Sequence, residues 1–257
     1  MIVACAAAGL VLGAWVLAPL VPVDPLVAFV VGFGAVTGTT LAAAGVAPVL
    51  TRTGLAVVVL TAVAMLVTLY VVQAPEPLGA ILVTAVLLMA GGSVGGAVGG
   101  RIEHPGHLLA VVVVSLLVDT FSVYHPAGPT AAVVSQPRAL AVLALSWPML
   151  GTTETAPVLG VGDVIFASLY VAVSRRHGLG VRRTIVALAA GLAATMLAVV
   201  LSGLPIPALV GMGLAVLVAH PEARRLPAKD RRRGRVILAI LVALWLASWV
   251  RTLITSS

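Results

Sequence analysis

The chain has 257 residues, of which 61% are hydrophobic and only 9% are charged. Soluble domains carry about 25% charged residues, so this chain has too few charges to cover a surface that faces water. Composition and long apolar runs exclude a soluble enzyme, a secreted disulfide scaffold and a disordered protein, and they predict an integral membrane protein. The runs are continuous rather than alternating, which favours helices over a β-barrel.

Nine apolar runs are candidates for membrane-spanning helices, each of which needs about 20 mostly apolar residues. A tenth run, 139–150, is too short to span, and we expect an interfacial, re-entrant or extended segment there. The expected fold class is therefore an all-α polytopic membrane protein with about nine transmembrane helices in a single membrane domain. The candidate spans are 2–22, 25–50, 54–73, 78–99, 107–124, 156–174, 183–203, 205–219 and 235–255.

Lysine and arginine residues predict the orientation of these spans. If the N-terminus is cytoplasmic, only Arg138 and Arg251 of the 15 Lys and Arg residues face outward. Cytoplasmic loops carry an excess of basic residues, so this orientation is expected in the cell membrane, with the C-terminus and the 125–155 loop outside. The inward residues are Arg52, Arg101, Arg175, Arg176, Arg182, Arg183, Arg224, Arg225, Lys229, Arg231, Arg232, Arg233 and Arg235.

The net charge of +7 raises the question of a nucleic-acid partner. The basic residues lie in short loops, and the run 229–235 is interpreted as a cytoplasmic topology anchor rather than a nucleic-acid site, with anionic lipid as an alternative. The lipid bilayer is thus the expected partner. The single cysteine, Cys5, permits no intramolecular disulfide.

Small residues four apart end the fourth predicted span. Gly92, Gly96 and Gly100 in the stretch GGSVGGAVGG have this spacing. Glycines at such intervals let two helix backbones approach closely, so packing is the expected role. A phosphate loop is not expected, because no strand precedes the stretch and no Lys-Ser or Lys-Thr follows it.

Two of the eight acidic residues, Asp119 and Asp163, lie inside predicted spans. A carboxylate within a bilayer is costly and usually faces the bundle interior for a functional reason, although an Asp that only bonds a neighbouring helix is an alternative. Asp119 lies six residues before His125, where its span ends, and Asp163 lies seven residues after Ala156, where the next span begins. At 1.5 Å per residue, both would lie roughly 9–11 Å from the same membrane face and could meet.

Two adjacent carboxylates cannot both ionise cheaply, so they share a proton. The ionised member can accept a proton from water while the other donates to a carbonyl oxygen, which is the chemistry of aspartic proteases. Gly160 and Gly162 lack side chains, so backbone or substrate can approach Asp163 closely. Downstream, Pro205 and Pro207 break helical hydrogen bonding and free carbonyl groups.

At this point the sequence resembles the intramembrane aspartyl proteases, the family of presenilin and signal peptide peptidase. Asp119, the Gly-Val-Gly-Asp of 160–163 and the Pro-Ala-Leu of 207–209 occur in that order on three predicted spans. The resemblance extends to Pro-Ala-Gly-Pro at 126–129 and to Gly-Asp-Val-Ile-Phe at 162–166, and it covers about 107–219.

The resemblance implies a presenilin-like bundle that hydrolyses peptide bonds within transmembrane helices or signal-peptide remnants, with no metal or other cofactor. Asp119 and Asp163 would be the catalytic pair. The apolar segment 140–147 would lie beside the cleft and pair with unwound substrate, so proline at Val142 or Leu143 is expected to reduce cleavage without unfolding the protein. The implied active-site supports are Gly160, Val161 and Gly162, and the implied substrate-cleft residues are Pro207, Ala208, Leu209, Leu140, Val142 and Leu143.

Two departures from the family accompany this resemblance. Val118 stands where the family usually has Tyr before the first Asp, and four spans rather than five precede Asp119. The second departure reverses the active-site helices relative to presenilin, as in signal peptide peptidase, and directs the active-site side outward. Substrates with a cytoplasmic N-terminus are therefore expected.

Three alternatives stay open. The prepilin peptidases share the Gly-x-Gly-Asp pattern but follow the second Asp with x-Lys, whereas Val164 and Ile165 follow Asp163 here. A small proton-coupled transporter would also use a buried pair of Asp residues. An inactive scaffold that retains the motifs is the third alternative.

The five histidines lack metal-ligand spacing on one helix, apart from His104 and His107, for which an interfacial role is expected.

Overall fold

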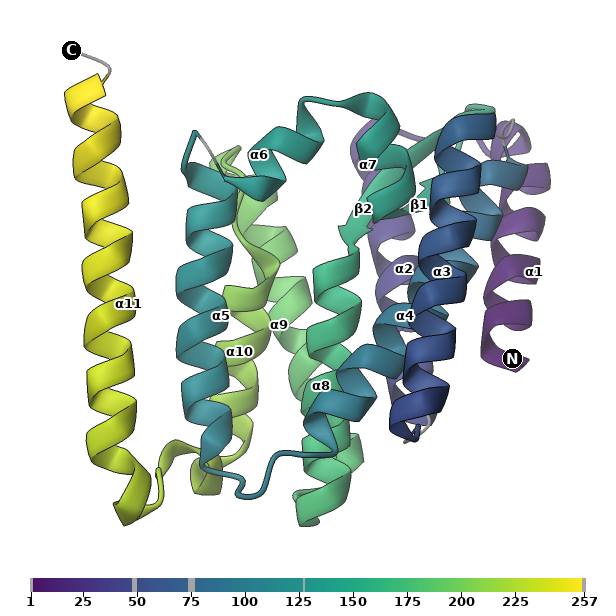
Figure 1. Ribbon diagram of the computed structural model, residues 1–257. Coiled ribbons are helices and arrows are strands. Elements are labelled where there is room, and N and C mark those ends of the chain that lie inside the picture. Colours follow the sequence, from purple (N-terminus) through teal and green to yellow (C-terminus); the bar gives the residue numbers. More distant parts are fainter. Residues whose placement is uncertain (1, 48–49, 74–76, 127, 256–257) are drawn as a thin grey trace. The chain divides into compact units, whose positions relative to one another are not determined.

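The computed structural model describes residues 2–47, 50–73, 77–126 and 128–255 (Figure 1). The described residues form helices and one two-stranded sheet, which confirms the all-α prediction. The chain divides into two compact units, one of 1–101 with 136–185 and the other of 102–135 with 186–257.

The first unit contains seven α-helices or short helical turns and the sheet. The helices α2 and α3 begin at side-chain caps: Asp24 Oδ1 accepts from Leu26 N–H at 2.8 Å, and Thr51 Oγ1 accepts from Gly54 N–H at 3.2 Å. The elements are α1 (Ile2–Leu17), η1 (Ala18–Leu20), α2 (Pro25–Val46), α3 (Arg52–Val72), α4 (Leu78–Gly99), α7 (Pro137–Leu143), β1 (Ala144–Pro148), β2 (Thr155–Gly160) and α8 (Val161–His177).

Helix α4 is the centre of this unit and packs backbone to backbone against α8. A Cβ on Gly95 would lie 2.0 Å from the Ile165 carbonyl oxygen, and a Cβ on Gly99 would lie 2.4 Å from that of Leu169. The glycines that contact α8 most closely are therefore Gly91, Gly95 and Gly99, one residue earlier than the predicted set. At Gly92 a Cβ would meet neighbours only at 3.7 Å or more.

Strands β1 and β2 pair antiparallel, from Ala144 opposite Gly160 to Pro148 opposite Thr155, with a bulge after Leu145. Strand β1 is buried along its length and packs against α4 and α2. The sheet corrects the predicted span 156–174, because β2 occupies its first residues and α8 begins only at Val161.

The sheet also divides the short apolar segment 139–150. Its extended conformation is confined to β1, whereas Leu140, Val142 and Leu143 lie in the helix α7. Of the three expected alternatives for 139–150, the extended one therefore holds only from Ala144 on, and the place of Leu140, Val142 and Leu143 in a substrate cleft stays a prediction. Proline at position 142 or 143 would break α7 and cannot test strand pairing.

The second unit is helical. Helix α5 packs against α10, α6, η2 and α11. A Cβ on Gly128 would lie 2.4 Å from the Ser122 carbonyl oxygen, so the tight turn after α5 requires glycine there. The elements are α5 (His107–Tyr124), α6 (Pro129–Val134), α9 (Val181–Ser202, in this unit from residue 186), α10 (Ala208–Ala219), η2 (Pro221–Arg224) and α11 (Ala228–Thr255).

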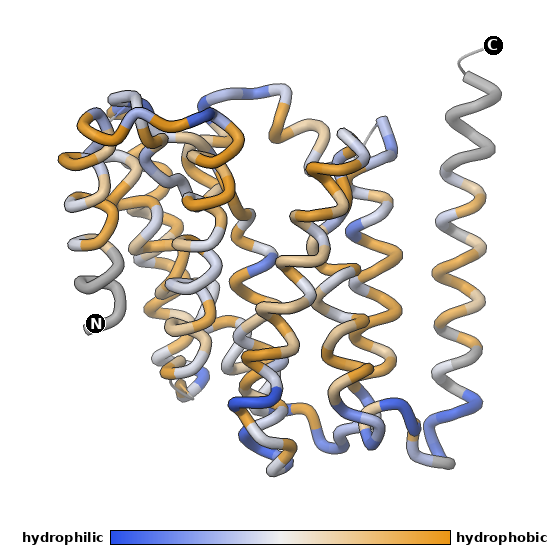
Figure 2. Tube along the Cα trace, turned by 180° about the vertical axis from the view of Figure 1, so that it is seen from behind, coloured by the Kyte–Doolittle hydropathy of each residue, from blue (hydrophilic) through white to orange (hydrophobic). Residues whose placement is uncertain are grey.

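Every predicted span overlaps a helix, but the helices differ in length. Among the described residues, α2, α3, α4, α5 and α9 are long and apolar enough to cross a bilayer. Helices α1, α8 and α10 have only 16, 17 and 12 residues, and α11 begins with a basic run. Within each unit, apolar residues follow the helices and hydrophilic residues gather near their ends (Figure 2). These long apolar helices are compatible with a membrane protein, and the count of nine spans stays a prediction.

Candidate active site

Asp119 lies on α5, half-buried, and its carboxylate contacts the start of α10. Its Oδ2 accepts a hydrogen bond from the backbone N–H of Leu209 at 3.1 Å. The first N–H groups of a helix lack partners within that helix. Pro207, the N-cap of α10, offers no side-chain acceptor, so the carboxylate of Asp119 serves one of these groups instead. A negative charge is favourable at this end of a helix dipole.

This hydrogen bond joins two of the sequence motifs. Asp119 and the Pro-Ala-Leu triplet are 90 residues apart in the chain and meet within the second unit. Pro207 is buried and extended, with φ −60° and ψ 126°, and the helix begins directly after it. The start of α10 directly after Pro207 therefore places the backbone N–H of Leu209 next to the carboxylate of Asp119.

Asp163 lies in the first turn of α8 in the other unit. Its Oδ2 accepts from the backbone N–H of Gly160 at 3.1 Å, with Gly160 at the N-cap and Asp163 three residues later. This is the acidic half of a capping box. Because α8 begins at Val161, Asp163 is the third helical residue rather than the eighth, and the argument for equal depth loses its basis.

The glycines beside Asp163 leave it accessible. Gly160 ends β2, and a Cβ there would lie 3.5 Å from Asp163 Oδ2, an ordinary contact. Apart from the chain neighbours of Gly162 and the backbone of its own helix, no heavy atom lies within 4 Å of the position that a Cβ there would occupy. Val161 between them is half-buried. The space beside Gly162 can thus hold at least a methyl group without a clash.

The predicted site residues are divided between the two units. Asp119 and Pro207, Ala208 and Leu209 belong to the second unit. Asp163 with Gly160, Val161 and Gly162, and also Leu140, Val142 and Leu143, belong to the first. Each acid is positioned within its own unit, so the meeting of Asp119 with Asp163 stays a prediction.

Two arginines that the sequence assigned only to topology hold the far end of α8. Arg175 donates to the carbonyl oxygens of Gly45 and Ala47, at the end of α2, and Arg176 donates to that of Gly100, at the end of α4. Arginine at a helix C-terminus satisfies carbonyl groups that lack helical partners. Together with the α4 glycines, these contacts fix the helix that carries Asp163.

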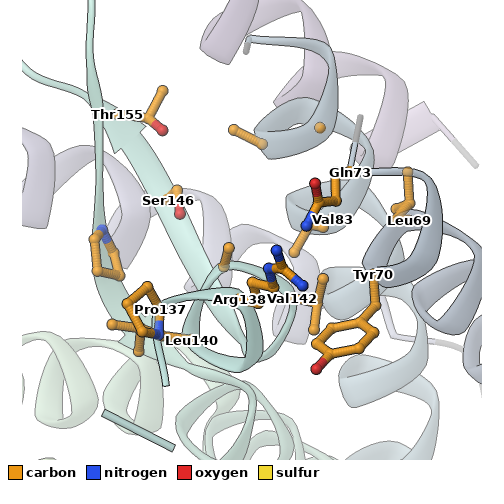
Figure 3. A pocket seen from close by; sticks show the side chains of 14 residues that line it. Leu69, Tyr70, Gln73, Val83, Pro137, Arg138, Leu140, Val142, Ser146 and Thr155 are labelled. Atoms are coloured by element: carbon orange, nitrogen blue, oxygen red, sulfur yellow. The ribbon is translucent and has the colours of Figure 1, made fainter. Parts of the chain in front are cut away.

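Sequence reasoning also missed a cavity in the first unit. It has a volume of about 460 Å³ and is lined by α3, α4, α7, β1 and β2, including Leu140 and Val142 (Figure 3). Leu143 is not among the lining residues and is exposed. No local sequence pattern predicts this cavity, because its lining residues, such as Gln73 and Arg138, come from segments that are distant in the sequence.

Within the described part of the chain, no group of three or more His, Cys, Asp or Glu side chains lies close enough to hold a metal ion. Comparisons with protein-family models, with curated proteins and with solved structures find no match to this chain.

Proposed function

We propose that the protein is an intramembrane aspartic endopeptidase with Asp119 and Asp163 as its catalytic pair. The observation that carries the proposal is the hydrogen bond from Leu209 N–H to Asp119 Oδ2. It brings the first acid into contact with the Pro-Ala-Leu triplet, and a cleft that is built from these motifs requires this contact. The order of the three motifs favours a presenilin-like bundle of about nine spans.

The proposed reaction is the addition of one water molecule to a peptide bond. The ionised carboxylate removes a proton from water, and the water oxygen bonds to the scissile carbonyl carbon. The protonated carboxyl donates its proton to the carbonyl oxygen. When the C–N bond breaks, the carboxyl that took a proton from water gives it to the amide nitrogen, which leaves as an amine, and a hydroxyl of the tetrahedral intermediate returns a proton to the other carboxylate. This reaction requires that both carboxyls reach the same water, and it forms no covalent enzyme intermediate.

The environments of the two acids suit these roles. Each carboxylate is oriented by a backbone N–H at the start of a helix, from Leu209 for Asp119 and from Gly160 for Asp163. Oriented acids avoid the reorganisation that free side chains would need in the transition state. The open space at Gly162 gives an unwound substrate backbone a route to Asp163.

We propose further that the unwound substrate pairs with the two-stranded sheet, which ends directly at Gly160. The pairing segment is confined to Ala144–Trp147 and its partner β2. Exposed Pro157 on β2 provides a test position. In a background with Cys5→Ser, Pro157→Cys should cross-link to a substrate that carries one cysteine, whereas exposed Leu60→Cys on α3 should not. Equal cross-linking at both positions would contradict strand pairing.

The orientation inferred from the basic residues makes substrates with a cytoplasmic N-terminus the expected class. A reporter fused to the C-terminus tests this orientation, since it should be active only outside the cell. A reporter that is active in the cytoplasm would reverse the topology and the expected substrate class.

The decisive experiment is cleavage of a model transmembrane substrate by the purified protein. Asp119→Asn and Asp163→Asn keep the size of the side chain and an oxygen that can accept from the backbone N–H. Each should lower the cleavage rate at least about a hundredfold, the factor that general acid–base catalysis supplies. Asp24→Asn is the matched control, because Asn also caps a helix and α2 lacks any proposed catalytic role.

Full activity in either of the first two variants would reject the catalytic pair. A transporter would behave differently, because wild-type protein in vesicles would carry a proton-coupled flux without cleaving the substrate. That flux would disappear in the same Asp→Asn variants.

A further inference from the structure

The cavity of the first unit combines an apolar wall with one cationic side chain. Leu69 and Val83 contribute to its apolar wall, and Arg138 is the charged residue among those that line it (Figure 3). A volume of about 460 Å³ is in the range of small-molecule sites. The lining therefore fits a molecule that is both apolar and anionic.

Gln73 holds the guanidinium of Arg138. With the amide orientation that satisfies both groups, Gln73 Oε1 accepts from Arg138 Nε at 2.8 Å and from Nη2 at 3.0 Å. Gln73 has φ 52° and ψ 58°, and among the described residues no other non-glycine has positive φ. Residues other than glycine rarely adopt this left-handed backbone conformation. Here it ends α3 and presents the amide to Arg138.

The charge of Arg138 lacks a carboxylate partner in the described part of the chain. The ion pairs found there are those of His107 with Asp230 and of His220 with Glu222. A guanidinium has five N–H donors, and Gln73 takes two of them. The others can bind two oxygens of a phosphate side by side. Because Arg138 belongs to the outward loop of the inferred topology, it does not serve as a cytoplasmic anchor.

Helix α3 forms one wall of this cavity and is itself largely exposed. It is the most apolar of the five long helices, and only 6% of its apolar window is buried inside the protein. Tyr70, on its last turn, is 43% exposed and lines the cavity. Tyrosine is typical of the level of lipid headgroups. A ligand can therefore enter beside α3 from the bilayer.

We propose that this cavity binds an anionic phospholipid. Arg138 binds the phosphate, Tyr70 lies at headgroup level, and the first part of an acyl chain lies against Leu69, Leu140 and Val142. The volume suits a headgroup and the start of a chain, while the rest of the lipid stays in the bilayer. An acidic peptide would match the charge but not the apolar wall. The cavity shares β1 and β2 with the proposed substrate-pairing sheet, but neither Asp119 nor Asp163 lines it.

The test uses the full-length protein, purified in non-ionic detergent and stripped of lipid. Binding of phosphatidylglycerol and of phosphatidylcholine is measured by native mass spectrometry. Wild-type protein should prefer phosphatidylglycerol. Arg138→Gln should weaken that binding by about tenfold to a hundredfold, the factor that a lost charge-assisted hydrogen bond supplies. Arg182→Gln removes the same charge from an exposed position outside the cavity and should bind as wild type.

A second variant fills the cavity without changing its charge. Ala141 is exposed and lines the cavity, so Ala141→Phe should reduce binding while the helical circular dichroism stays at the wild-type level. Asp119→Asn should bind phosphatidylglycerol as wild type does, which separates this site from the protease proposal.

Several outcomes would overturn the proposal. They are equal binding of the two lipids, wild-type binding by both Arg138→Gln and Ala141→Phe, and an equal loss in Arg182→Gln. Displacement of the lipid by equimolar inorganic phosphate would show a site for the phosphate group alone. Displacement by a short acidic peptide would show a peptide site.

Discussion

The contact between α4 and α8 predicts opposite effects for two neighbouring glycine substitutions. In Gly95→Ala, the new Cβ would start 2.0 Å from the Ile165 carbonyl oxygen. Ordinary van der Waals contact begins at 3.4 Å, so the two backbones have to separate by about 1.4 Å. A gap of 0.5–1 Å already loses roughly a quarter to a half of the dispersion energy of a contact.

The magnitudes follow from these distances. Overpacking of this kind costs about 1–3 kcal/mol, and against a backbone atom the upper part of that range applies. The higher helix propensity of alanine offsets about 1 kcal/mol of this cost, so Gly95→Ala should destabilise the protein by about 1–2 kcal/mol in total. Gly92→Ala has the same propensity gain with neighbours at 3.7 Å and 3.9 Å, and it should stabilise by about 0.5–1 kcal/mol.

The assay is thermal loss of helical circular dichroism in detergent for both variants and wild type. The two melting temperatures should move in opposite directions. Because α8 carries Asp163, Gly95→Ala should also lower cleavage of the model substrate, whereas Gly92→Ala should not. Equal melting temperatures for the two variants would refute the close packing of α4 on α8.

Three further predictions use the same melting assay. Gly162→Ala should leave stability unchanged or raise it by up to about 1 kcal/mol, because no neighbouring atom opposes the new methyl group. Cleavage should fall, since that methyl group occupies the proposed approach to Asp163. Unimpaired cleavage would reject this route. Arg175→Met should destabilise by about 1–3 kcal/mol through loss of its hydrogen bonds to the end of α2; exposed Arg182→Met is its control and should change stability by less than about 0.5 kcal/mol. Gly128→Ala should destabilise by about 1–3 kcal/mol, because its Cβ would meet three carbonyl oxygens within 2.8 Å; an unchanged melting temperature would contradict the turn after α5.

Hydropathy alone predicted two helices to the residue. The run 107–124 coincides with α5, and 78–99 coincides with α4. Both runs are bounded by Pro, Gly or His, which sharpen the ends of an apolar segment. The run 156–174 failed because β2 and α8 are both apolar and adjoin without a polar break. Periodicity cannot separate a short buried strand from a helix in such a run.

A local signal for the correct start of α8 was nevertheless available. An acid three residues after Gly160 is the spacing of a helix cap, and it places the N-terminus at Val161. The contact of Asp119 with Leu209 carries no such signal, because it depends on how α5 and α10 pack. The same holds for Gln73 and Arg138, which are joined through the tertiary structure of the first unit.

The pairing of α4 with α8 has a consequence for biosynthesis. Gly99, the last glycine of the contact, precedes Val161 by about 60 residues. At roughly 5–20 residues per second, a ribosome takes about 3–12 s to make that segment. The glycine face of α4 is therefore synthesised seconds before α8, while α5 and α6 are made. Until then this face lacks the helix against which it packs most closely in the folded unit.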